Sequence, residues 1–430
     1  MRALFATYGF SGHLKPLVPL GWALRAAGHE VVVASHPYFA RTITGAGLPA
    51  LPAGPEFDLH GEVSRDAAEH DGYRRQLAEV QAAGRVTTGV VRLADGTVSP
   101  ALRGRSAGPA GQDDSSAAGR RSRTAARLEL PGLRPAVRSA DVMADDLVAF
   151  ARWWRPDIVV FEPLAFAGPL VARVLGVPAV RVLWTADFTV PLEKFESALF
   201  GELLERLGLP ALGLNGDLTL DPCPPMLQVD DGFPRQLMRY VPYNGTTVLP
   251  AWLREPPRRR RICVCWGTSV TVLSPGRMAS APAAVQAMAD LDADVVLAVL
   301  ESQLPLLGTL PSNVIAAGPV ALDLLLPTCD ALIHHGGGGT LMTGLVHGVP
   351  QVIVPYIPDT CFNAIQLAKT GAARAVWAED ATAAELRRAA AVVLGVPGCR
   401  EAARSLRAQM LSQPTPADTV PTLERLASGG

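Results

Sequence analysis

The stretch from Ala331 to Ala364, ALIHHGGGGTLMTGLVHGVPQVIVPYIPDTCFNA, constrains the fold of this chain more than any other segment. It reads as four consecutive elements: an apolar strand (331–334), a glycine-rich turn (336–339), a short helix (340–347) and a second strand (351–355). This pattern is typical of a βαβ unit, in which a helix joins two parallel strands. The stretch therefore predicts an α/β fold.

The glycine-rich turn and the start of the following helix form a predicted anion site. Glycines let the backbone approach a ligand closely, and a helix N-terminus offers unpaired N–H groups and the positive end of a dipole. Such a site favours a diphosphate as its ligand. His335 and Asp359 follow the two strands, so they are expected at the phosphate and at sugar hydroxyls, respectively. A tight packing turn is the alternative, because a glycine run alone is not specific.

The first 35 residues show a similar rhythm, which predicts the opening of a doubly wound sheet: strand (2–8), loop (9–15), helix (17–27) and strand (30–35). His13 lies in the loop, at the carboxyl end of the first strand. Glu162 follows another predicted strand, Pro156–Phe161. Since parallel strands end at one edge of a sheet, Glu162 is expected to approach His13. A carboxylate there orients the imidazole, whose other nitrogen can take a proton.

Both residues also have simpler interpretations at this stage. A lone histidine in a loop is commonly a surface residue, and a carboxylate before a helix commonly caps it. The choice between the interpretations depends on the likeness of these segments to a known family.

Together the segments resemble glycosyltransferase family 1, in its branch of actinomycete enzymes that attach deoxysugars to macrolides and other polyketides. WRPDIVVFEP (154–163) is similar to that branch. The other matching residues are Gly12, His13, Pro16, Gly28–Val31, His334–Gly337, Gly339, Thr340, Gly348–Gln351, Asp359 and Asn363–Ala364. The resemblance implies the α/β GT-B fold, in which two Rossmann-like, doubly wound domains face each other across a cleft.

The resemblance also implies roles for individual residues. The catalytic pair is His13, the general base, and Glu162, which orients it and which stands where many relatives carry Asp. The implied donor-binding residues are Thr268, Ser269, Val320, His335, Gly337, Gly338, Gly339, Thr340, Asp359 and Thr360. The acceptor contacts are expected to be Phe10, Trp184 and Phe188. Thr360 stands where many relatives have Gln.

The implied reaction moves a deoxysugar from a thymidine diphosphate (TDP) sugar to a hydroxyl of a macrolide or aromatic polyketide, with inversion of the anomeric centre. The TDP-deoxysugar is a co-substrate, and no metal or other cofactor is expected because no carboxylate cluster suggests one. Relatives often need a cytochrome-like activator protein, and a homodimer is a further candidate assembly. Two other functions stay open: a nucleotide-sugar epimerase on the same fold, and a catalytically impaired, nucleotide-sugar-binding auxiliary homologue.

Composition and resemblance together suggest the domain boundaries. We predict an acceptor-binding domain over residues 1–245, a Pro- and Arg-rich linker over 246–260, a donor-binding domain over 261–411, and a C-terminal helix (412–430) that packs back on the first domain.

Residues 85–138 depart from this pattern, since they are rich in Arg, Gly, Ser, Ala and Pro and contain no Phe, Tyr, Trp or Ile. Such a segment is expected to be a disordered insertion or the product of a reading-frame error. Resequencing the DNA tests the second hypothesis, because an unshifted frame would remove it.

Other features of the composition argue against several classes of partner. The net charge is −1, and no aromatic residues interleave the Arg-rich segment, which argues against nucleic acids and anionic membranes. No apolar run reaches the length of a membrane span, and the first residues do not read as a secretory signal. The six cysteines are scattered and predict a cytoplasmic protein with reduced thiols.

Overall fold

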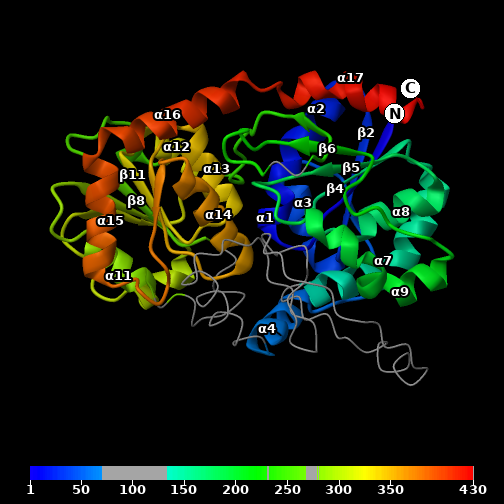
Figure 1. Ribbon diagram of the computed structural model, residues 1–430, viewed down its shortest axis with the longest axis horizontal. Coiled ribbons are helices and arrows are strands. Elements are labelled where there is room, and N and C mark those ends of the chain that lie inside the picture. Colours follow the sequence, from blue (N-terminus) through cyan, green and yellow to red (C-terminus); the bar gives the residue numbers. More distant parts are fainter. Residues whose placement is uncertain (70–132, 230–231, 268–277, 279, 430) are drawn as a thin grey trace, which may run out of the picture.

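The computed structural model describes residues 1–69, 133–229, 232–267, 278 and 280–429. These residues form two lobes, each built on a parallel sheet flanked by helices (Figure 1). The arrangement confirms the predicted fold class of two Rossmann-like α/β domains. Thr268 and Ser269, predicted to bind the donor, and residues 85–132 of the atypical segment lie outside the described residues.

The sheet of the first lobe has seven parallel strands in the order β3-β2-β1-β4-β5-β6-β7. Their bounds are β1 (Arg2–Ala6), β2 (Glu30–Ser35), β3 (Ala50–Pro52), β4 (Ile158–Phe161), β5 (Ala179–Val182), β6 (Leu218–Asp221) and β7 (Arg235–Leu237). Strands β4 and β5 are buried along their whole length, as expected for a parallel sheet covered on both faces. Because β1 and β4 are parallel neighbours, the segments that carry His13 and Glu162 leave the sheet at the same edge.

Helices cover both faces of this sheet. One face packs against α2 (Val18–Ala26), α3 (Ala40–Gly45) and the C-terminal α17 (Pro416–Ala427). The other face packs against α7 (Leu133–Trp154), α8 (Ala167–Leu175) and α9 (Glu196–Leu207). The remaining helical segments are α1 (Ser11–Leu14), α4 (Leu59–Glu69) and the 3-10 turns η1 (Lys15–Leu17), η2 (Pro37–Phe39), η5 (Val190–Phe195) and η6 (Ala251–Leu253).

Helix α7 begins inside the segment that the sequence predicts to be atypical. The sequence predicts atypical chain through residue 138, whereas residues 133–138 form the first turns of α7. Leu133, Ala136 and Ala140 follow helical spacing and are buried in the first-lobe core, and Arg138 forms an ion pair with Glu62 of α4. The average composition of the long segment conceals this short apolar face.

His36 ties the end of β2 to α7. Its Nε2 lies 2.7 Å from Ser139 Oγ, and burial lowers the pKa of the ring from 6.5 to about 4. The folded protein therefore holds this ring neutral at pH values where the unfolded chain protonates it. The contribution of this neutral ring to the free energy of unfolding is fully present above pH 6.5 and is lost as the pH falls toward 4.

We therefore expect the stability advantage of the wild type over His36→Gln to shrink by about 1.4 kcal/mol per pH unit in this window. Denaturant unfolding of both proteins between pH 7.5 and 4.5 measures the difference. Parallel pH profiles of the two proteins would contradict the neutral buried ring.

The second lobe has a sheet of six parallel strands in the order β10-β9-β8-β11-β12-β13. These are β8 (Arg261–Cys265), β9 (Asp294–Ala298), β10 (Val314–Gly318), β11 (Ala331–His334), β12 (Gln351–Ile353) and β13 (Ala373–Ala375). Its helical segments are α11 (Ser280–Ala287), α12 (Leu322–Leu325), α13 (Gly338–Val346), α14 (Pro358–Lys369), α15 (Ala383–Gly395), α16 (Pro397–Ser412), and the 3-10 turns η8 (Glu301–Leu307) and η9 (Leu326–Thr328).

The last two helices connect the lobes. Figure 1 shows α16 running along the second lobe and α17 continuing over the first. Helix α16 packs against α13, and α17 packs against α2, with Val420 and Leu423 buried in the first-lobe core. The two helices thus tie the second lobe to the outer face of the first.

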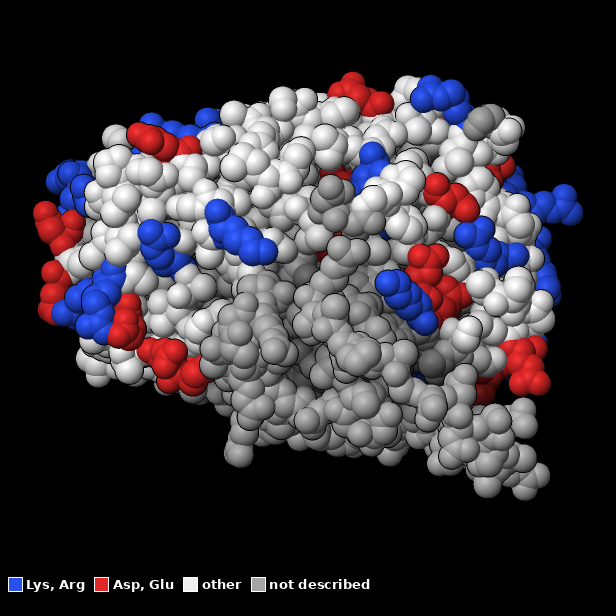
Figure 2. Space-filling view, in the orientation of Figure 1, with Lys and Arg blue, Asp and Glu red and all other residues white. Residues whose placement is uncertain are grey.

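Two features of the described residues concern helix length and the distribution of charge. Among the described residues, no helix combines the length and the apolar character needed to cross a membrane. On the face that Figure 2 shows, the basic and acidic side chains of the described residues are interspersed. An extended basic stripe, the usual electrostatic footprint of a nucleic-acid site, does not stand out on this described face.

Candidate active site

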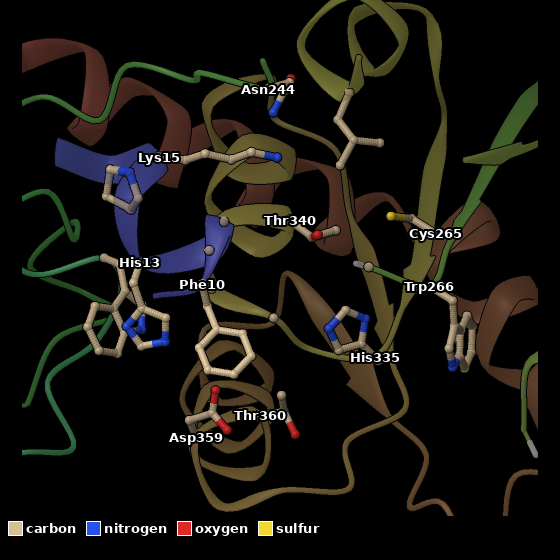
Figure 3. A pocket seen from close by; sticks show the side chains of 18 of the residues that line it. Phe10, His13, Lys15, Asn244, Cys265, Trp266, His335, Thr340, Asp359 and Thr360 are labelled. Carbon is tan, nitrogen blue, oxygen red and sulfur yellow. The ribbon is translucent and has the colours of Figure 1, made fainter. Parts of the chain in front are cut away.

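A cavity of about 540 Å³ is lined by both lobes. Figure 3 shows side chains from the two lobes meeting around it. It brings together every described residue of the predicted site except Glu162: Phe10, His13, Trp184, Phe188, Val320, His335, Gly337, Gly338, Gly339, Thr340, Asp359 and Thr360. Glu162 has no solvent-exposed surface and lies behind His13.

His13 and Glu162 are in direct contact. His13 Nδ1 lies 3.0 Å from Glu162 Oε2. The segment that carries His13 is not the predicted open loop, because residues 11–14 form α1 and η1 follows with Pro16 in its first turn. This short helical segment turns His13 toward the cavity.

The Glu162 carboxylate also accepts two backbone hydrogen bonds. Tyr8 N–H donates to Oε1 at 2.8 Å, and Leu164 N–H donates to Oε2 at 3.0 Å. The contact with His13 agrees with the first interpretation left open by the sequence. The side chain does not cap α8, whose N-cap is Phe166 without a side-chain hydrogen bond; the Leu164 N–H lies in the turn before that helix. Since these contacts fix the carboxylate, they also fix the orientation of the His13 ring.

Aromatic rings surround His13 on the first-lobe side of the cavity. The rings of Trp184 and Tyr8 meet its imidazole edge-on, with centroids 4.7 and 5.3 Å away. Phe10 lies 6.1 Å from it, and Phe188 lies 6.2 Å from Trp184. With Nδ1 held by Glu162, Nε2 is the nitrogen left to exchange a proton with a ligand. The aromatic walls suit a large apolar ligand that carries a hydroxyl.

The glycine-rich turn forms the opposite side of the cavity. Helix α13 begins at Gly338, two residues before the predicted start, so the glycines themselves form its first turn. Gly336 has φ +95°, which favours glycine. The N–H groups of a helix's first turn have no partner within the helix, and Gly338, Gly339 and Thr340 all line the cavity. These features suit a bound anion.

Close packing leaves no room for a side chain at Gly337. A Cβ there would lie 2.7 Å from His335 Nε2. We expect Gly337→Ala to displace His335 and to weaken the binding of a nucleotide diphosphate by about tenfold, the scale of an overpacked contact. Calorimetric titration measures the change. Gly398→Ala is the matched control, since a Cβ at that position meets nothing within 4 Å. Equal affinities in the two variants would contradict this tight packing.

Two residues that the sequence pattern includes without a role hold this turn in place. His334 Nδ1 accepts the Gly336 N–H at 3.1 Å, and its Nε2 lies 2.7 Å from Gln351 Oε1. Asn363 Nδ2 donates to the Gly336 carbonyl at 3.0 Å, while its Oδ1 accepts the Thr185 hydroxyl of the first lobe at 3.0 Å. Asn363 therefore couples the turn to the opposite lobe, next to Trp184.

His335 is a neutral hydrogen-bonding group in this environment. Its ring lies close to Gly267 and Gly337, where added Cβ atoms would come within 2.6 and 2.7 Å of ring atoms. Burial lowers the pKa of His335 to about 4. The ring therefore carries no charge near neutral pH, and what it offers a phosphate is one N–H donor.

Asp359 and Thr360 lie in the first turn of α14, and both line the cavity. The Thr360 hydroxyl donates to the Ile357 carbonyl at 2.9 Å and accepts the N–H groups of Tyr356 and Ile357 at 3.1 Å each. The Thr360 hydroxyl is therefore engaged in a backbone cap of the turn before α14.

The cavity also contains residues that the sequence did not single out. Tyr240 reaches from the first lobe, and its hydroxyl donates to the Gly339 carbonyl at 3.3 Å. Lys15 lines the cavity two residues after His13. No sequence signal marks Tyr240, whereas the position of Lys15 in the loop of His13 could have drawn attention to it. Among the described residues, no group of three or more His, Cys, Asp or Glu is placed to hold a metal ion.

Comparison with known proteins finds relatives that extend over the whole chain. The family models described as erythromycin biosynthesis protein CIII-like match residues 22–90 and 73–267 (N-terminal domain) and 283–426 (C-terminal domain). The 3-alpha-mycarosylerythronolide B desosaminyl transferase of Saccharopolyspora erythraea is 35% identical over 448 residues, which cover 100% of this chain and 99% of the relative. The TDP-daunosamine transferase DnrS of Streptomyces peucetius is 36% identical over 452 residues, with coverage of 100% and 97%.

A similar solved structure is glycosyltransferase VinC in complex with dTDP. It superimposes with a TM-score of 0.73 at 31% sequence identity, over 100% of both chains.

Proposed function

This chain belongs to the erythromycin biosynthesis protein CIII-like family of glycosyltransferases, and we propose that it moves a deoxysugar from a TDP-sugar to a hydroxyl of a macrolide or aromatic polyketide. One observation carries the proposal: the His13–Glu162 pair of one lobe and the glycine-rich anion turn of the other line the same cavity. The relatives named desosaminyl and TDP-daunosamine transferases, and the VinC complex with dTDP, support the substrate classes.

On the acceptor side, His13 is the proposed general base. Its Nε2 takes the proton of the acceptor hydroxyl as the oxygen attacks the anomeric carbon of the sugar. Glu162 holds Nδ1 and stabilises the imidazolium that forms. Phe10, Trp184 and Phe188 provide apolar contacts for the polyketide. The bond from the anomeric carbon to the diphosphate breaks in the same displacement, so the configuration inverts and TDP leaves.

On the donor side, α13 and the residues around it receive the diphosphate. The N–H groups of Gly338, Gly339 and Thr340 and the neutral His335 ring are the proposed donors to its oxygens. Asp359 accepts hydrogen bonds from sugar hydroxyls. Val320 is the proposed backbone contact of the base. Thr268 and Ser269 remain predicted donor contacts outside the described residues. We propose that these groups act without a metal ion.

A transfer assay tests this function against the two alternatives. The protein is incubated with a TDP-deoxysugar and a set of macrolide and anthracycline aglycones, and TDP release and glycoside formation are followed by mass spectrometry. We expect TDP release to depend on the aglycone. An epimerase would convert or release the sugar without any aglycone, and an impaired homologue would bind TDP and transfer nothing. Parallel reactions include a cytochrome-like activator protein. They distinguish an enzyme that lacks its activator from a catalytically impaired homologue.

The setting of the enzyme is also part of the proposal. We propose a cytoplasmic protein, and the six unpaired cysteines support a reducing compartment. A homodimer is the proposed assembly to be checked by light scattering of the purified enzyme.

A further inference from the structure

The donor site described above lacks a full positive charge. A nucleoside diphosphate carries at least two negative charges, and a helix N-terminus offers the equivalent of about half a positive charge. His335 is neutral near pH 7 because burial lowers its pKa to about 4. Lys15 is the only lysine or arginine among the described residues that line the cavity.

Lys15 comes from the lobe opposite the anion turn. It is the first residue of η1, and its half-buried side chain extends across the cavity (Figure 3). Its positive charge acts electrostatically on Cys265, the last residue of β8. Burial raises the pKa of that thiol to about 11, while a hydrogen bond to Thr340 and the charge of Lys15 oppose the rise. Figure 3 shows the Lys15 side chain pointing toward the wall of the cavity that carries Thr340, in the first turn of α13, and Cys265.

The strand register places Cys265 beside the anion turn. Cys265 is paired with His334, the last residue of β11, and the chain then enters the turn at His335 and Gly336. A side chain that points toward Cys265 and Thr340 consequently points toward the ends of β8 and β11. A diphosphate bound at the first turn of α13 would occupy the same region.

No carboxylate within the described ranges forms an ion pair with Lys15. Burial lowers the pKa of Lys15, because the partly desolvated ammonium is less stable in the folded protein than in water. A lysine without a structural partner usually extends its ammonium into bulk water. Lys15 instead extends into the cavity, where an anionic ligand would supply the missing counter-charge.

We propose that Lys15 binds the diphosphate of the nucleotide sugar across the cleft and supplies the positive charge that the glycine-rich turn lacks. This inference rests on the proposed function. The contact strengthens as the bond between the anomeric carbon and the diphosphate breaks, because the electron pair of that bond goes to a phosphate oxygen. Lys15 thus acts on the leaving group, and the reaction requires no proton from it.

The test compares Lys15→Met with Lys369→Met by calorimetric titration with TDP, TMP and thymidine. Methionine keeps the length of the side chain and removes its charge. Lys369 is the matched control because it is exposed on α14 and does not line the cavity. We expect Lys15→Met to weaken TDP binding by about tenfold or more, in keeping with a charge-assisted hydrogen bond, and to leave thymidine binding unchanged. Lys369→Met should match the wild type with every ligand.

Two results would overturn the inference: unchanged TDP affinity in Lys15→Met, or an equal loss for TDP and thymidine, which would indicate a change of shape instead of charge. Circular dichroism establishes that the variant is folded. If the folded wild type itself does not bind TDP, the proposed function fails, and the inference fails with it. If the wild type binds TDP and Lys15→Met binds equally well, only the inference fails.

Discussion

Replacement of His13 by alanine is expected to lower turnover by about 10²- to 10⁴-fold while leaving nucleotide binding unchanged. The range is the usual contribution of a general acid–base group. His13 is the imidazole in the cavity whose Nδ1 is held by a carboxylate, so its loss removes the proposed acceptor of the hydroxyl proton. Glycoside formation at saturating substrates measures turnover, and calorimetric titration with TDP measures donor binding.

His347→Ala provides the matched control. This histidine also contacts a carboxylate, since its Nε2 lies 2.8 Å from Asp323 Oδ1, but it does not line the cavity. We expect its turnover to equal that of the wild type. A His13→Ala enzyme that turns over at the wild-type rate would remove the general base from the mechanism, whatever the control does.

Replacement of Glu162 by glutamine is expected to lower turnover by about 10²-fold with little change in the KM of the donor. The carboxylate accepts His13 Nδ1–H and two backbone N–H groups, and an amide cannot accept all three with one oxygen. The imidazole then loses its fixed tautomer and the stabilisation of its charged form, as in other carboxylate–histidine pairs.

The alternative, in which Glu162 only caps backbone N–H groups, makes a different prediction. Glu162→Gln would then lower the free energy of unfolding without a comparable loss of turnover. Steady-state kinetics across a pH series, together with denaturant unfolding of the same samples, separates the two roles. Glu162→Asp should retain more activity than Glu162→Gln, because the shorter carboxylate can still pair with the imidazole.

Local pattern was sufficient to predict the parallel sheets and which candidate residues follow their strands. The strands around Ala331–His334 and Arg2–Ala6 are short apolar runs followed by glycine-containing turns, and parallel strands place such turns at one edge. That rule alone predicted that Glu162 approaches His13, because the strands before them end at the same edge of the sheet. The structure adds the 3.0 Å contact between them.

Other features depend on contacts that a linear pattern does not encode. The Thr360 hydroxyl is engaged with its own backbone, which depends on the local geometry of the turn before α14. Lys15 and Tyr240 reach the donor side only because the two lobes face each other. The early start of α7 depends on burial of Leu133 against the sheet, although the surrounding composition suggests no order.

Thermal unfolding of the purified protein with TDP and with uridine diphosphate, repeated on His335→Ala, decides whether the glycine-rich turn is a nucleotide diphosphate site. A ligand that binds only the folded state stabilises it by about 2.7 kcal/mol at a hundredfold excess over its dissociation constant. We expect a shift that is larger with TDP than with uridine diphosphate and that His335→Ala greatly reduces. The absence of a shift with either nucleotide, in a wild-type protein that circular dichroism shows to be folded, would contradict the assignment of the donor site.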